Sequence, residues 1–93
     1  MGMYEVAELY TVYGTHDCEY CERTKILLEH YKKNWRFVNV TEKAEYMEAF
    51  NKKTNNAKKV PQIFLYQTER GEYEVHIGGF NDLQAWLDNS YRI

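Results

Sequence analysis

One stretch decides the fold of this 93-residue chain: Ala7-Glu8-Leu9-Tyr10-Thr11-Val12-Tyr13-Gly14-Thr15-His16-Asp17-Cys18-Glu19-Tyr20-Cys21. Its first half is rich in β-branched and aromatic residues, which predicts a strand that stops at Gly14. A short polar loop then leads to Cys18, and a helix is expected from about Glu19. The two cysteines, spaced Cys-x-x-Cys, therefore lie where a loop that follows a strand turns into a helix.

The chain contains two cysteines, too few for a disulfide-rich secreted scaffold or for the four ligands of a structural zinc. At the start of a helix, free N–H groups and the positive end of the helix dipole favour a thiolate and lower the pKa of the first cysteine. Cysteines at i and i+3 can also close a disulfide, so that one sulfur attacks a target and the other resolves the mixed disulfide. The alternatives are two small core residues, or half of a metal site completed by another chain. Position and spacing favour redox chemistry.

The hydrophobic pattern predicts the remaining elements. Thr24, Leu27, Leu28 and Tyr31 recur at the i, i+3, i+4, i+7 spacing of an amphipathic helix. A strand is expected over 35–40, followed by a helix from an N-cap at Thr41 to Lys53, whose buried side is Tyr46, Met47, Ala49 and Phe50. Two more strands are expected over 60–66 and 73–77, joined by a turn at 69–72. A last helix is expected from Asn81 or Asp82.

The expected order β-α-β-α-β-β-α indicates an α/β fold in which a four-stranded mixed sheet is flanked by three helices. A chain of this length supports one domain, over residues 1–93. Its 12 Lys and Arg residues nearly balance 14 Asp and Glu residues, for a net charge of −2. This balance gives no general electrostatic case for binding nucleic acid or anionic membranes. The apolar runs are too short to span a bilayer and the first residues lack a signal-peptide pattern, so we expect a cytoplasmic protein.

Four motifs carry a resemblance to a known family: Cys18-Glu19-Tyr20-Cys21, Val60-Pro61-Gln62-Ile63-Phe64, Gly78-Gly79 followed by Phe80-Asn81-Asp82-Leu83, and Ala85-Trp86-Leu87. In this order and spacing, the chain resembles the glutaredoxins, within the thioredoxin fold, over nearly its whole length. The resemblance implies a glutathione-dependent disulfide oxidoreductase. Cys18 would attack a protein disulfide or a glutathione mixed disulfide, Cys21 would resolve the intermediate, and reduced glutathione would restore the dithiol. No metal and no cofactor beyond glutathione is implied.

The resemblance also implies where glutathione binds. Pro61 would follow a cis peptide bond, the backbone of Val60 would pair with the cysteine end of glutathione, and the Gly-Gly turn would hold its γ-glutamyl end. N–H groups at a helix start suit a carboxylate, and the Asp82 carboxylate suits the free α-ammonium. Helix capping by Asn81 or Asp82 is the alternative role, compatible with the first. The candidate glutathione contacts are Tyr20, Lys59, Val60, Pro61, Gly79, Phe80, Asn81 and Asp82.

Two positions depart from the family pattern. Glu19 replaces a proline that many glutaredoxins carry, and a carboxylate beside Cys18 opposes thiolate formation. We therefore expect a less acidic thiol and a more reducing couple. Thr15 stands where the family often has a basic residue, and Lys59, with Lys58 beside it, is expected to supply that charge. The alternative for these lysines is a solvated surface.

The resemblance leaves three functions open. Besides the glutathione-dependent enzyme, the chain resembles small reductants served by thioredoxin reductase. It also resembles carriers in which Cys18 thiolates from two chains and two glutathiones hold a 2Fe–2S cluster, since Glu19 replaces the proline. Cys-Glu-Tyr-Cys is similar to phage-encoded glutaredoxins, which implies ribonucleotide reductase among the disulfide-containing clients and the host cytoplasm as the location. A monomer is expected.

Overall fold

Four strands and three helices make up the computed structural model, which describes residues 7–68 and 71–90. They follow the predicted order: β1 (Glu8–Gly14), α1 (Glu19–His30), β2 (Trp35–Asn39), α2 (Ala44–Thr54), β3 (Gln62–Gln67), β4 (Tyr73–Gly78) and α3 (Phe80–Ser90). The predicted α/β fold with a four-stranded sheet and three helices is confirmed. Part of the predicted turn at 69–72 lies outside the described residues.

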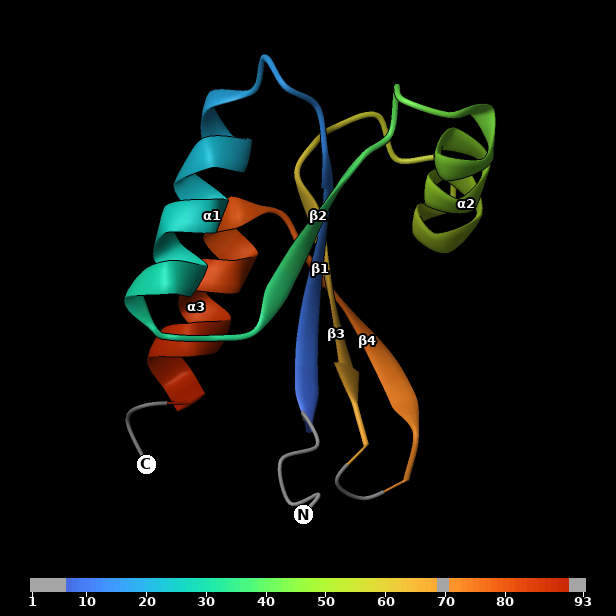
Figure 1. The fold of residues 1–93 in the computed structure, drawn as a ribbon. Coiled ribbons are helices and arrows are strands. Elements are labelled where there is room, and N and C mark those ends of the chain that lie inside the picture. Colours follow the sequence, from blue (N-terminus) through green and yellow to red (C-terminus); the bar gives the residue numbers. More distant parts are fainter. Residues whose placement is uncertain (1–6, 69–70, 91–93) are drawn as a thin grey trace.

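The sheet has the strand order β2-β1-β3-β4. β1 and β2 are parallel, because α1 crosses over between them, whereas β1 with β3 and β3 with β4 are antiparallel. Helices α1 and α3 lie side by side on one face and α2 lies on the other (Figure 1). The sheet is therefore mixed, and β1 runs through its middle.

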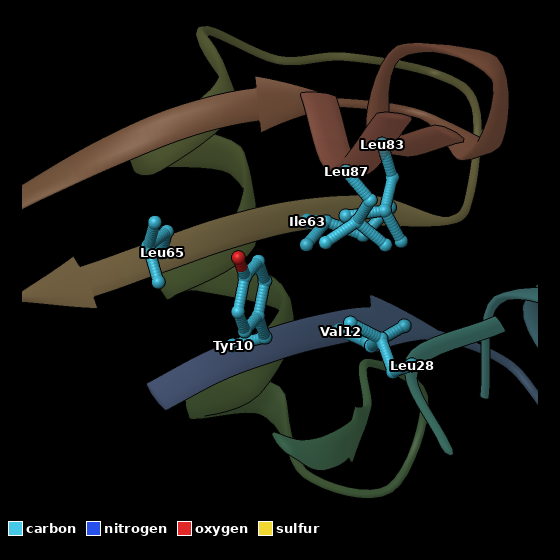
Figure 2. Close-up of a cluster of buried hydrophobic side chains, with 7 residues drawn as sticks. All are labelled: Tyr10, Val12, Leu28, Ile63, Leu65, Leu83 and Leu87. Carbon is cyan, nitrogen blue, oxygen red and sulfur yellow. The ribbon is translucent and has the colours of Figure 1, made fainter. Parts of the chain in front are cut away.

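The main core lies between the sheet and the α1–α3 layer (Figure 2). Its fully buried members are Tyr10, Val12, Leu28, Ile63, Leu65, Leu83 and Leu87. A second cluster, under α2, joins Tyr13 and Phe64 to Phe50 and Val40. Alternate residues of β1 thus enter opposite cores, as a strand that is covered on both faces requires. This packing fixes the start of α1 and the start of α3 at the same end of the sheet.

The prediction for α2 was wrong in two respects. The helix begins at Ala44 after an extended Lys43, not after Thr41. The side-chain oxygen of Asn39 accepts hydrogen bonds from the Thr41 N–H and hydroxyl, at 2.9 and 2.7 Å, and so holds Thr41 in a turn. Met47, predicted to be buried, is 38% exposed, while Phe50 carries the buried face of the helix.

Smaller boundary differences affect the site. β3 begins at Gln62, so Val60 and Pro61 precede the strand instead of opening it. α3 begins at Phe80, one residue before the predicted Asn81. Within residues 7–68 and 71–90, none of the helices combines the length and the apolar character that crossing a membrane requires.

Candidate active site

Cys18 is the N-cap of α1. Its backbone is extended, and its sulfur accepts a hydrogen bond from the Cys21 N–H at 3.1 Å. The two cysteines are joined as a disulfide, with their Cα atoms 5.2 Å apart. Cys18 is partly exposed, whereas Cys21 is 0% exposed. An attacking sulfur must reach its target and a resolving sulfur must reach only the first sulfur, so this difference fits attack by Cys18 and resolution by Cys21.

The helix terminus favours negative charge on the Cys18 sulfur. In the first turn of a helix the N–H groups have no intrahelical acceptor, and the dipole is positive at this end. The sulfur therefore takes the place that a serine or aspartate oxygen takes in an ordinary N-cap. The same hydrogen bond from Cys21 is available to a thiolate once the disulfide is reduced.

Gly14 lies directly behind the buried cysteine. A Cβ atom at this position would overlap the Cys21 sulfur and would come within 3.0 Å of the Phe37 ring. Gly14 is itself buried at the end of β1, and its carbonyl accepts a hydrogen bond from the Val40 N–H at 2.9 Å. The absence of a side chain at residue 14 is thus what makes room for Cys21.

A groove of about 470 Å³ lies next to the cysteine motif: neither cysteine lines it, but its lining includes Tyr20 and Val60, whose carbonyl oxygen is 3.9 Å from the Cys18 sulfur. The structure places all eight predicted glutathione contacts around it, together with Gln62, and its lining is Tyr20, Lys59, Val60, Pro61, Gln62, Gly79, Phe80, Asn81 and Asp82. Gln62 was not predicted. Its position directly after Pro61, at the start of a strand, was the available signal.

One wall of the groove is the Val60–Pro61 segment. The peptide bond between these residues is cis, as the resemblance implied. The Val60 carbonyl oxygen lies 3.9 Å from the Cys18 sulfur. Because β3 starts only at Gln62, the backbone groups of Val60 lie outside the ladder of the sheet, where they can pair with an extended peptide.

The opposite wall is the N-terminus of α3. The Gly79 carbonyl accepts the first helical hydrogen bond, from the Leu83 N–H at 3.0 Å, which makes Gly79 the N-cap. The Asp82 carboxylate accepts a hydrogen bond from the Gly79 N–H at 3.0 Å, so Asp82 does cap the helix. A carboxylate has two oxygens, and capping by one leaves the other for a cation. Free N–H groups and a carboxylate on one wall suit a ligand that ends in both a carboxylate and an ammonium group.

Gly78 provides the turn into this wall. Its φ angle is +121°, and a Cβ atom there would overlap the Asp82 carboxylate. A Cβ atom at Gly79 would lie 3.5 Å from the Pro61 carbonyl oxygen, which is an ordinary contact. Of the two glycines, Gly78 is therefore the one that the backbone requires.

We expect Gly78→Ala to lower the free energy of unfolding by about 1–3 kcal/mol, because alanine is strained at positive φ and displaces Asp82. Gly79→Ala is the matched control, with an expected loss below about 1 kcal/mol. Urea denaturation of both variants measures the difference. Equal losses would contradict the assignment of the turn to Gly78.

Tyr20 and Phe80 close the groove at the exposed end of the cysteine motif. Their ring centroids are 5.5 Å apart, and the Arg23 guanidinium lies 5.0 Å from the centre of the Tyr20 ring. Arg23 also forms an ion pair with Glu19, at 2.7 Å. The carboxylate that replaces the proline is thus partly neutralised by a charge on the same helix.

The Glu19–Arg23 pair predicts opposite shifts of the redox potential. Glu19→Gln stabilises the Cys18 thiolate and raises the potential, whereas Arg23→Gln leaves Glu19 uncompensated and lowers it. The pair is exposed, so each shift is expected to be at most about 20 mV. Equilibration with glutathione redox buffers measures both. Shifts of the same sign in the two variants would show that charge at residue 19 does not set the potential.

Lys59 lies at the edge of the groove with an exposed side chain, and Lys58 is exposed beside it. The Lys59 carbonyl accepts a hydrogen bond from the Gln62 side chain at 3.1 Å.

At the far end of β3, Tyr66 donates a hydrogen bond to Glu72, which raises the pKa of the Tyr66 phenol. That phenol is remote from Pro61 and takes no part in the groove.

Comparison with known proteins identifies one matching protein family. The glutaredoxin family model matches residues 10–68, well over half of the chain. This stretch contains both cysteines and the Val60–Pro61 segment, while the N-terminus of α3 lies beyond it. No curated protein sequence matches the chain.

Solved structures show the same fold. The buckwheat glutaredoxin–glutathione complex has a TM-score of 0.66 at 17% identity, covering 91% of this chain and 73% of that one. The NrdH-redoxin of Escherichia coli, described as having a thioredoxin-like activity profile, has a TM-score of 0.58 at 20% identity, and the match covers 91% of this chain and 96% of that one. The dithiolic glutaredoxin 2-C-Grx1 of Trypanosoma brucei brucei has a TM-score of 0.63 at 23% identity, and the match covers 87% of this chain and 78% of that one.

Proposed function

This chain belongs to the glutaredoxin family, and from that premise we propose that it is a glutathione-dependent enzyme that reduces protein disulfides and glutathione mixed disulfides. Its cysteine pair makes it a dithiol oxidoreductase in general terms. One observation carries the finer proposal: the more accessible sulfur of the pair, Cys18, caps a helix and lies 3.9 Å from the Val60 carbonyl, in the wall of a groove that suits the two ends of glutathione.

The first half-reaction oxidises the enzyme. The Cys18 thiolate attacks one sulfur of a client disulfide, forming a mixed disulfide, and the second client sulfur leaves as a thiolate that takes up a proton. Cys21 loses its proton and attacks the Cys18 sulfur, which closes the Cys18–Cys21 disulfide and releases the first client sulfur as a thiol. The client has gained two electrons. The disulfide of this structure is the product state of that step.

The second half-reaction uses two molecules of glutathione. The first glutathione thiolate attacks Cys18, forms a mixed disulfide with it and frees Cys21. The second glutathione thiolate attacks the glutathione sulfur of that mixed disulfide, which releases oxidised glutathione and the Cys18 thiolate, while the freed Cys21 takes up a proton from water. Both reacting sulfurs, Cys18 and Cys21, lie on the same chain and are joined to each other, which supports the proposal that the enzyme acts as a monomer.

The groove fits glutathione at three points. The Val60 backbone, 3.9 Å from the Cys18 sulfur, faces the cysteine residue of the bound tripeptide. The N-terminus of α3 and the Asp82 carboxylate receive the carboxylate and ammonium of the γ-glutamyl end. Lys59, at the groove edge, receives the glycine carboxylate in place of the family's basic residue at position 15.

Replacing Lys59 by alanine is expected to raise the KM for a glutathione mixed disulfide about twofold to fivefold, since an exposed charge pair contributes little. The turnover number should stay near that of the wild type, because Lys59 does not touch the sulfurs. Steady-state kinetics give both constants. Lys52→Ala removes an exposed lysine of α2 and is the control; if the two variants behave alike, Lys59 is only a solvated surface residue.

A coupled assay tests the proposed function directly. NADPH consumption is followed with a glutathione mixed disulfide as substrate, once with glutathione and glutathione reductase and once with thioredoxin reductase. We expect turnover with the first system. Turnover with thioredoxin reductase alone would instead assign the chain to the small reductants of that second system.

The proposed clients are disulfide-containing proteins of the cytoplasm, with ribonucleotide reductase among them. The open groove and the exposed Tyr20 beside it leave room for a polypeptide around the reacting sulfur. Reduction of purified ribonucleotide reductase, followed by its activity, tests this client; no gain over glutathione alone would exclude it.

A further inference from the structure

His76 on β4 contacts the side chain of Gln62, the groove residue that follows Pro61. The His76 Nε2 atom and the Gln62 Oε1 atom are 2.8 Å apart. The Gln62 Nε2 atom in turn donates to the Lys59 carbonyl at 3.1 Å. A chain of two hydrogen bonds therefore runs from β4, through Gln62, to the segment that begins at Lys59 and forms one wall of the groove.

The second hydrogen bond determines the direction of the first. A backbone carbonyl can only accept, so the Gln62 end that faces Lys59 must be the NH₂ group. The oxygen of the same amide then faces His76, and a carbonyl oxygen requires a donor. His76 must therefore carry a proton on Nε2, and the Nδ1–H tautomer of a neutral ring would leave two acceptors facing each other.

The His76 ring is supported by a stacking contact with Phe64. It stacks on Phe64 with ring centroids 4.4 Å apart and planes at 11°. Phe64 is itself 4% exposed and meets Tyr13 edge-on in the core under α2. His76 and Phe64 are register partners across β3 and β4, and Gln62 lies two residues from Phe64 on the same face, within diagonal reach of His76. A buried core residue thus supports the ring that orients Gln62.

We propose that His76 is a positioning residue for the groove: its Nε2–H orients Gln62, and Gln62 holds the Lys59 carbonyl and with it the Val60 backbone beside Cys18. The proposal rests on the proposed function, because the Val60 backbone is the part of the groove that would bind the cysteine end of glutathione. His76 touches neither substrate nor sulfur. Its loss should weaken binding and leave the chemical step unchanged.

Kinetics of three variants test this role. His76→Phe keeps the stack on Phe64 and removes the donor, and we expect the KM for a glutathione mixed disulfide to rise about threefold to tenfold, the effect of one hydrogen bond. The turnover number should change less than about twofold. His76→Gln places an amide N–H near the position of Nε2 and should restore the KM, whereas His76→Asn places it near Nδ1 and should not. His30→Phe, on α1, is the control and should match the wild type.

NMR spectroscopy tests the hydrogen bond without any substrate. Long-range ¹H–¹⁵N spectra of the neutral ring should show the His76 proton on Nε2, and the Gln62 side-chain amide signal should shift in His76→Phe and return in His76→Gln. An Nδ1–H tautomer would overturn the proposal, and so would a wild-type KM in His76→Phe. These spectra do not depend on activity. If the protein fails the coupled assay but shows the Nε2–H tautomer, the proposed function is wrong and the hydrogen bond between His76 and Gln62 still stands.

Discussion

Replacing Cys18 by serine should abolish both protein-disulfide reduction and deglutathionylation, by at least about 100-fold, because it removes the exposed nucleophile. Cys21→Ser should abolish the reduction of protein disulfides and keep deglutathionylation, since a second glutathione can release the mixed disulfide at Cys18 without a resolving thiol. The coupled glutathione reductase assay with each class of substrate measures the four combinations.

The prediction depends on the different exposure of the two sulfurs. Cys18 is partly exposed at the N-cap and Cys21 is fully buried behind it, so their roles cannot be exchanged without unfolding the start of α1. Circular dichroism of both variants is the control for folding. Activity retained in Cys18→Ser and lost in Cys21→Ser would reverse the assignment.

Gly14→Ala is expected to lower the free energy of unfolding by about 1–3 kcal/mol, the usual cost of overpacking. The added methyl group would overlap the Cys21 sulfur and press on Phe37. Both neighbours are held, Cys21 by α1 and Phe37 by its packing against the main core, so neither can move without disturbing other contacts. Urea denaturation in the oxidised state measures the loss.

The same substitution should also change the chemistry, because the sulfur that must yield is the resolving one. We expect Gly14→Ala to slow the reduction of protein disulfides more than deglutathionylation, since only the former needs Cys21. Gly71→Ala is the control for a stability loss without overlap: alanine is strained at its φ of +98°, but a Cβ atom there meets nothing within 4 Å, so the ratio of the two activities should stay at the wild-type value. If Gly14→Ala is as stable as the wild type and keeps both activities, residue 14 does not position Cys21.

Much of this arrangement could be predicted from local sequence. The helix after the cysteines, with Thr24 and Leu28 fully buried, follows from apolar spacing alone. Four strands follow from β-branched and aromatic runs bounded by glycine or polar turns. Apart from Tyr20, which lies between the cysteines, the predicted glutathione contacts fell on two short motifs, 59–61 and 79–82. Pairing of β3 with β1 brings the first motif towards Cys18, and packing of α3 against α1 brings the second.

Other features depend on contacts that sequence spacing does not reveal. Thr41 has the chemistry of an N-cap, yet Asn39 engages it in a turn, so α2 starts at Ala44. Helical periodicity predicted a buried Met47, whereas the single buried residue Phe50 anchors this short helix on the sheet. The importance of Gly14 appears only when α1 is packed behind β1.

The central claim, that the groove beside Cys18 binds glutathione, is tested most directly by amide chemical shifts of the Cys21→Ser variant before and after it forms a mixed disulfide with glutathione. We predict that the shifts concentrate at Val60, at Gln62 and at the N-terminus of α3 around Asn81 and Asp82. Shifts confined to the immediate neighbours of Cys18, with none at Val60 or Asp82, would contradict the account.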